Sequence, residues 1–151
     1  LMMWMLAQAA STWAMTGIIW FVQLVQYPGF ASVDPASFPN FHARHSASIS
    51  MIVGPLMILE ALSSFALLWS PLGFQTSGEV WLGVGLLAVI WGSTFLLQVP
   101  LHTKLGVRFD DSVWRALVRS NWIRTVAWSA RAALVTLWVS RALASIPESG
   151  V

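Results

Sequence analysis

Four long apolar stretches constrain the fold of this chain more than any other feature. A helix that crosses a bilayer needs roughly 20 mostly apolar residues, and segments of about that length cover residues 2–26, 46–69, 80–99 and 121–144. A proline follows each of them within a few positions, namely Pro28, Pro71, Pro100 and Pro147. Because helices usually end at or before the residue that precedes a proline, the pattern predicts an all-α fold. We expect a single domain (1–151), an integral membrane four-transmembrane-helix bundle.

Composition agrees with a membrane location. Hydrophobic residues make up 57% of the chain and charged residues 9%, whereas a soluble domain carries about 25% charged residues. The chain has ten tryptophans and one tyrosine, and tryptophan favours the boundary between membrane and water. The sequence contains no cysteine, which excludes disulfides, thiolate metal sites and cysteine redox chemistry. We expect membrane lipid as a partner, and the composition is compatible with membrane-protein partners or a homo-oligomer.

The uneven distribution of basic residues predicts an orientation. A cluster around the third connection consists of Lys104, Arg108, Arg115, Arg119 and Arg124. Arg44 lies in the first connection, whereas the second holds only Glu79. The positive-inside rule then places both long connections in the cytoplasm of a bacterial inner membrane, with both termini outside. Nucleic-acid binding explains the basic cluster less well, because the cluster lies between two apolar stretches, and we expect no nucleic-acid partner.

The two halves of the chain resemble each other. "IIWFVQLVQYP" ends the first apolar stretch and "VIWGSTFLLQVP" ends the third, and each has an Ile-Trp pair. Each also has a glutamine two residues before a proline, Gln26 before Pro28 and Gln98 before Pro100. The pattern predicts two repeated helical hairpins around a pseudo-two-fold axis along the membrane normal.

Polar side chains concentrate where the apolar stretches meet the connections that we expect in the cytoplasm. They are His42, His45, His102, Gln26, Gln98, Asn121 and Arg124. The topology of a four-helix bundle brings these ends into one layer, and we interpret the residues as candidates for ligand binding. Imidazole is a common ligand for metal ions and haem, so a metal ion or haem at His45 and His102 is one interpretation. Hydrogen bonding at the membrane interface is the simpler one.

Glu60 and Arg131 are ionisable residues deep inside the second and fourth stretches. Glu60 lies fifteen residues after His45, which is roughly 22 Å along a helix, so the two cannot share a metal ion. A carboxylate in hydrocarbon must face the bundle interior and find a partner. Arg131 lies at nearly the same expected depth. The sequence therefore predicts a buried Glu60–Arg131 ion pair, which would either hold the helices in register or line an internal cavity.

Three short stretches carry a family resemblance. "VQYPGF", "QVPLHTKL" and "LVRSNWIRTVAWSAR" resemble the small four-helix membrane proteins that are grouped with fungal anthrone oxygenases, most of whose bacterial members have no known function. Pro100 and Leu105 match the family's Pro-x-Asn-x-x-Leu pattern, and His102 stands where the family often has Asn. Trp122, Arg124 and Thr125 correspond to its Trp-x-x-x-Arg-Thr pattern with closer spacing.

This resemblance implies oxidation of a flat, polycyclic or quinone-like substrate near the membrane face. It implies roles in binding or proton transfer for His42, His45, His102, Asn121 and Arg124. The first hypothesis is therefore a membrane protein that binds or oxidises such a lipophilic small molecule. The alternative is a non-enzymatic accessory subunit of a respiratory or photosynthetic complex, in which histidine would ligate haem or a chlorin. A small transporter is a third reading, and the sequence itself requires no cofactor.

Overall fold

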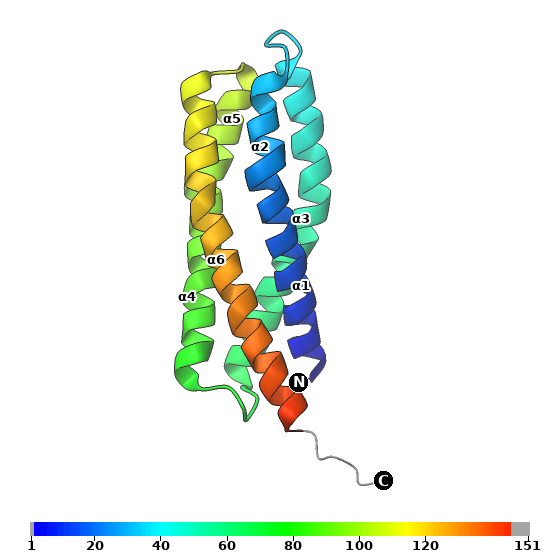
Figure 1. Ribbon diagram of the computed structural model, residues 1–151, viewed down its shortest axis with the longest axis vertical. Coiled ribbons are helices and arrows are strands. Elements are labelled where there is room, and N and C mark those ends of the chain that lie inside the picture. Colours follow the sequence, from blue (N-terminus) through cyan, green and yellow to red (C-terminus); the bar gives the residue numbers. More distant parts are fainter. Residues whose placement is uncertain (1, 146–151) are drawn as a thin grey trace.

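The computed structural model describes residues 2–145, which fold into four long helical rods packed as one bundle (Figure 1). The first rod joins α1 (Met2–Phe21), the π-helix η1 (Val22–Gln26), α2 (Tyr27–Gly29) and the 3₁₀ turn η2 (Phe30–Ser32). The second is α3 (Phe38–Trp69). The third joins α4 (Ser77–Ser93), the π-helix η3 (Thr94–Gln98) and α5 (Val99–Val107), and the fourth is α6 (Asp111–Ala144). The all-α four-helix bundle expected from the sequence is confirmed.

The rods alternate in direction, so that each end of the bundle collects particular connections. The connections at residues 33–37 and 108–110 lie together at one end, which we call the distal end. The connection at residues 70–76 lies at the other end with Met2 and Ala144, and we call this the terminal end (Figure 1). Pro147, which was expected to end the fourth helix, lies outside the described residues.

Two of the expected helix ends are wrong, because the first and third rods continue past Pro28 and Pro100. A proline in an α-helix lacks an N–H and collides with the carbonyl four residues earlier. Here a π-helix precedes each proline, and the N–H of Tyr27 bonds to the carbonyl of Val22 five residues back. Val99 bonds in the same way to Thr94. The widened turn accommodates the proline ring, so helix replaces most of the long connections that the prolines predicted.

Polar caps fix where α4 and α6 begin. Thr76 and Glu79 form a reciprocal capping box at the start of α4. Asp110 accepts hydrogen bonds from the amides of Ser112 and Val113 at the start of α6. The Ser112 hydroxyl and these amides hold the pKa of the Asp110 carboxyl below its usual range. These caps set the register in which α6 enters the bundle.

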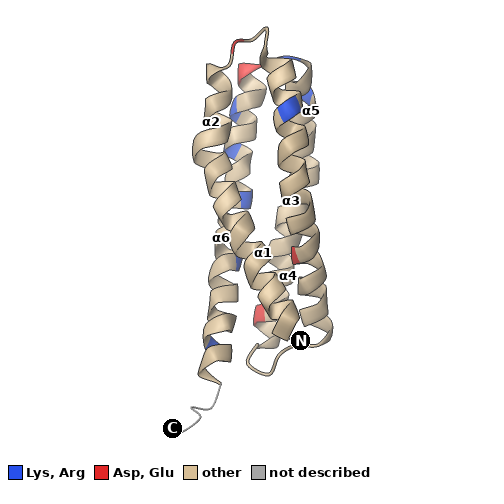
Figure 2. Cartoon of the chain, turned by 90° about the vertical axis from the view of Figure 1, so that its right-hand side faces the viewer, with Lys and Arg blue, Asp and Glu red and all other residues tan. Residues whose placement is uncertain are grey.

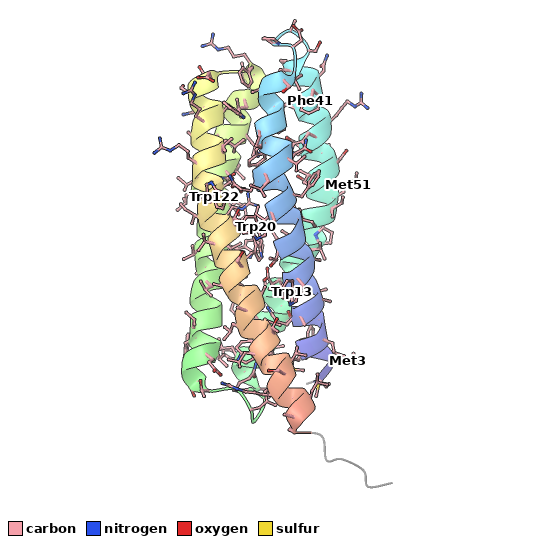
Figure 3. The ribbon with its side chains drawn as sticks, in the orientation of Figure 1. Met3, Trp13, Trp20, Phe41, Met51 and Trp122 are labelled. Carbon is pink, nitrogen blue, oxygen red and sulfur yellow. The ribbon has the colours of Figure 1, made fainter. Side chains whose placement is uncertain are left out.

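The outside of the bundle is apolar and much of its inside is polar. Met3 and Trp69 are 81% and 85% exposed, and Figure 3 shows Met3 and Met51 pointing away from the bundle. The rods Met2–Ser32, Phe38–Trp69 and Ser77–Val107 are long and apolar enough to cross a membrane. α6 does not meet that criterion because it carries arginines along its length, so the fourth expected span is not confirmed.

A polar layer connects all four rods in the terminal half. Glu60 of α3 is fully buried and accepts hydrogen bonds from Thr12 of α1 and from Trp128 and Arg131 of α6. Arg131 also donates to the carbonyl oxygen of Gly83 in α4. Gln8, Ser63 and Ser64 extend the same network. The expected Glu60–Arg131 ion pair is thus present, with 2.8 Å between Nε and Oε1.

Candidate functional site

A cavity of about 410 Å³ lies in the distal half of the bundle, among all four rods. Its floor is apolar and is formed by Met15, Ile18, Ile19, Val22 and Val53. Its polar wall lies nearer the distal connections and includes Tyr27, His42, His45, Gln98 and His102. Arg124 lines the cavity from further along α6. A cavity of this size falls within the range of small-molecule sites, which are mostly apolar with a few placed polar groups.

His102 is the centre of the polar wall. Its Nδ1 lies 2.9 Å from Nε2 of His42, and its Nε2 lies 2.8 Å from the hydroxyl oxygen of Tyr27. Both ring nitrogens of His102 are therefore engaged. Because a neutral imidazole has one donor and one acceptor nitrogen, the three side chains form a directional chain of hydrogen bonds.

This chain can exist in two proton arrangements. Tyr27 can donate to His102, which then donates from Nδ1 to His42. Alternatively His42 donates to His102, His102 donates to the Tyr27 oxygen, and Tyr27 donates to Oε1 of Gln98 at 3.4 Å. A group that takes a proton at one ring nitrogen and releases it at the other can relay protons. The geometry thus provides a short proton path along the cavity wall.

His45 completes the cluster of imidazoles. Its ring is stacked on that of His102 with 6.3 Å between centroids, and it meets Phe30 edge-on at 5.1 Å. Nδ1 of His45 lies 3.3 Å from the side-chain nitrogen of Gln26. Gln26 therefore orients His45 from behind and does not itself line the cavity.

Local structure explains why these side chains meet. The π-turn η1 lies directly before Tyr27, and Tyr27 is buried there as the first residue of α2. In the third rod, Gln98 and His102 are four residues apart and therefore share a helix face. Gly106, one turn further, faces His42, because a Cβ added there would lie in van der Waals contact with Nδ1 of His42 at 3.6 Å. The His42 ring therefore packs against α5.

The amides join the rods around the cavity. Gln98 donates to the Ser120 hydroxyl at 2.9 Å, and Asn121 donates to Oε1 of Gln23 at 2.9 Å. Asn121 is fully buried but does not line the cavity. Arg124 lies on α6 one turn further and does line it, with its Cζ 5.3 Å from the ring centroid of Trp128.

The structure gathers the predicted polar residues in the distal half of the bundle, but only some of them line the cavity. Five of them line the cavity, namely His42, His45, His102, Gln98 and Arg124, whereas Gln26 and Asn121 support it. Sequence reasoning missed Tyr27. The signal was present, because Tyr27 is the single tyrosine and lies four residues after Gln23, on the same helix face.

The described residues do not form an evident metal centre. Across residues 2–145, no group of three His, Asp or Glu side chains is placed to hold a metal ion. His42 and His102 bond to each other, and His45 and His102 stack rather than direct nitrogens to a common point. A ligand that uses several imidazoles would first have to break these contacts.

Comparisons of this chain with protein-family models, with curated proteins and with solved structures give no match.

Proposed function

We propose that this chain is an integral membrane protein whose distal cavity binds a flat, lipophilic ring with oxygen substituents, such as a quinone or a polycyclic phenol. The observation that carries the proposal is the joining of an apolar floor to a phenol–imidazole chain in one cavity. A flat ring would lie on the apolar floor, and its oxygen would meet the polar wall.

Hydrogen bonding on the outer surface supports membrane insertion. Trp13 and Trp20 are 54% and 39% exposed, yet their indole N–H groups donate to the hydroxyls of Thr136 and Ser129. In hydrocarbon an N–H without a partner costs several kcal/mol, whereas in water no such partner is needed. Trp20 also packs edge-on against Trp122 on the face where α1 and α6 meet (Figure 3).

The fourth rod can cross the membrane with the other three. Its two most buried arginines, Arg124 and Arg131, face the interior rather than lipid, as intramembrane ionisable residues generally do. The rods exceed the membrane in length, because 31 residues span about 46 Å and hydrocarbon is about 30 Å thick. The cavity, near the distal end, would therefore lie close to one membrane face.

The charge distribution supports a cytoplasmic distal end in a bacterial inner membrane. Exposed basic residues gather there, namely Arg44, Lys104, Arg108, Arg115 and Arg119 (Figure 2). At the terminal end, Arg141 pairs with Glu79 at 2.9 Å. The pairing offsets the one arginine whose position argues against this orientation under the positive-inside rule.

The two π-helices support the proposed internal repeat. Each ends at a glutamine that lies two residues before a proline, in the first and third rods respectively. π-turns of this kind occur frequently at functional sites, and both flank the cavity. A duplicated hairpin with two diverged half-sites would produce this arrangement.

The proposed ligand would enter from the bilayer between α3 and the third rod. Ser50 of α3 and Val99 and Thr103 of the third rod line the cavity and are also exposed on the outside. A bound ring hydroxyl could pass its proton to the Tyr27–His102–His42 chain. The same chain could return a proton to a ring oxygen.

Direct binding tests this proposal. The purified full chain in phospholipid nanodiscs should bind 1,4-naphthoquinone, as measured by isothermal titration calorimetry. His102→Gln should weaken binding at least about threefold, the cost of one hydrogen bond, while Asn40→Gln at an exposed distal position should leave it unchanged. Absence of naphthoquinone binding to a folded preparation would end the proposal.

A haem- or chlorin-ligating accessory subunit is the second candidate, and His45 favours it. Of the two ring nitrogens of His45, only Nδ1 has a hydrogen-bond partner among residues 2–145, namely the side-chain amide of Gln26. A ligating histidine is commonly oriented in this way through its other nitrogen. A visible haem or chlorin band in the purified protein that is lost in His45→Ala would favour this candidate, and a colourless preparation that binds naphthoquinone would exclude it.

A further inference from the structure

Arg124 is a buried cation without a counter-ion in the described structure. Its side chain is 7% exposed, and no carboxylate among residues 2–145 lies within ion-pairing distance of it. Its Nε is fully buried and has no hydrogen-bond partner in this part of the chain. The guanidinium lies against the Trp128 ring, which attracts the positive charge, and beside the Tyr27 hydroxyl, but neither of these neutral groups supplies a negative charge.

The second buried arginine of α6 shows what a satisfied guanidinium looks like in this bundle. Arg131 lies two turns further along the same face and bonds to Glu60, to Ser64 and to the carbonyl oxygen of Gly83. A buried charge is costly unless it is paired and hydrogen-bonded. Contacts within the described bundle therefore balance the charge of Arg131, whereas no carboxylate among residues 2–145 balances that of Arg124.

The missing counter-ion of Arg124 has a place to bind. Arg124 lines the distal cavity, and no Asp or Glu side chain lines that cavity with it. Ser46 lines the same cavity, and its hydroxyl is also buried without a partner in the described residues. The unsatisfied groups are thus potential hydrogen-bond donors, and the cavity carries one positive charge that no side chain on its wall balances.

We propose that the ligand of the distal cavity is a lipophilic anion, whose ionised oxygen pairs with Arg124 while its apolar body lies on the floor formed by Met15, Ile18 and Val53. This inference rests on the proposed function. It narrows the ligand class from flat rings with oxygen substituents to those whose oxygen is ionised. An enolate of a hydroxyquinone and the carboxylate of a fatty acid share this chemistry. The imidazole rings of His42 and His45 are inclined by 35° and 28° to that of His102, and aromatic groups on the cavity lining favour the ring over the fatty acid.

The test compares two rings that differ in charge. 2-Hydroxy-1,4-naphthoquinone is ionised at neutral pH, whereas 2-methoxy-1,4-naphthoquinone is uncharged and of similar shape. The full chain in nanodiscs should bind the hydroxy compound about tenfold or more tightly, as a charge-assisted hydrogen bond predicts. Arg124→Gln should remove most of this preference and Arg124→Lys should restore part of it. Arg119→Gln, which removes an exposed charge from the same helix, should leave the preference intact.

The outcomes separate this inference from the proposed function. If the wild-type chain binds both rings equally, or if Arg124→Gln keeps the preference, the anion inference is wrong while ring binding stands. If neither ring binds but dodecanoate binds and depends on Arg124, the anion inference stands and the ring proposal fails. If none of the three binds, both fail. Should Arg124→Gln not fold, the wild-type comparison and Arg124→Lys still decide.

Discussion

Glu60 and Arg131, 71 residues apart in the sequence, form an ion pair in which Arg131 Nε donates to Glu60 Oε1 at 2.8 Å. Both side chains are almost completely buried. The remaining oxygen of Glu60 accepts from Trp128, and the guanidinium reaches both α3 and α4 through Ser64 and Gly83. The pair therefore fixes the relative positions of the rods that also form the distal cavity.

Breaking this pair on one side should destabilise the bundle strongly. Glu60→Met leaves the Arg131 cation buried without its carboxylate, and we expect a loss of about 3–5 kcal/mol in unfolding free energy. The double variant Glu60→Met/Arg131→Met should be more stable than Glu60→Met alone, because neither charge remains. Unfolding followed by tryptophan fluorescence in detergent measures this.

The pair of Glu79 with Arg141 at the terminal end provides the control for that series. Glu79→Gln changes a partly exposed pair and should shift the unfolding midpoint only slightly, because exposed pairs contribute little. A Glu60→Met protein as stable as Glu79→Gln would show that the buried pair does not hold the rods together.

The orientation in the membrane can be tested cleanly because the sequence contains no cysteine. Ser37 in the first connection and Gly73 in the second are exposed at opposite ends of the bundle. In intact bacterial cells, a membrane-impermeant maleimide should label Gly73→Cys, whereas Ser37→Cys should react only after lysis. Labelling of Ser37→Cys alone in intact cells would reverse the orientation, and labelling of both would contradict membrane insertion of the bundle.

Much of the fold followed from apolar length, and the depth of charged residues predicted one long-range contact. Glu60 and Arg131 could be paired from the sequence because a charge inside an apolar helix requires a partner and few others were available. The helix ends could not be derived from Pro28 and Pro100, because the π-turns that accommodate them leave no distinct mark in the residue pattern.

The site was predictable as a gathering of polar residues but not as a cavity. Topology alone brings His42 and His102 to the same end of a four-helix bundle. Whether a side chain lines a space or supports its neighbour depends on helix rotation, which the π-turns change locally. For this reason Gln26 and Asn121 were predicted as ligand-binding candidates although they do not line the cavity, and Tyr27 was overlooked.

The Tyr27 hydroxyl should contribute to ligand binding as well as to folding. Tyr27→Phe keeps the buried ring and removes the hydrogen bond to His102, which is worth about 1 kcal/mol to stability. If the hydroxyl also positions the His102 chain for the ligand, naphthoquinone binding should weaken about threefold to tenfold. Calorimetric titration and thermal unfolding of the same preparation give both values.

Thr103→Val is the matched control for that substitution. Thr103 also lines the cavity, but its hydroxyl bonds to the carbonyl of Val99 in its own helix. Removing it should change naphthoquinone affinity less than Tyr27→Phe does. Equal effects of the two substitutions would mean that the Tyr27–His102 contact has no special part in binding.

The route of ligand entry between α3 and the third rod gives a further prediction. Ser50 lines the cavity and is exposed at its outer edge, whereas Ser48, two residues earlier, is exposed and lies away from the cavity. Ser50→Trp should fill the opening and lower naphthoquinone affinity more than about tenfold, because the ring can no longer be buried. Ser48→Trp adds the same side chain to the same helix and should bind like the unmodified protein. Both variants should keep the unfolding midpoint, since both side chains are exposed. If Ser50→Trp binds naphthoquinone with unchanged affinity and unchanged association rate, the ligand does not enter or occupy the cavity through this opening.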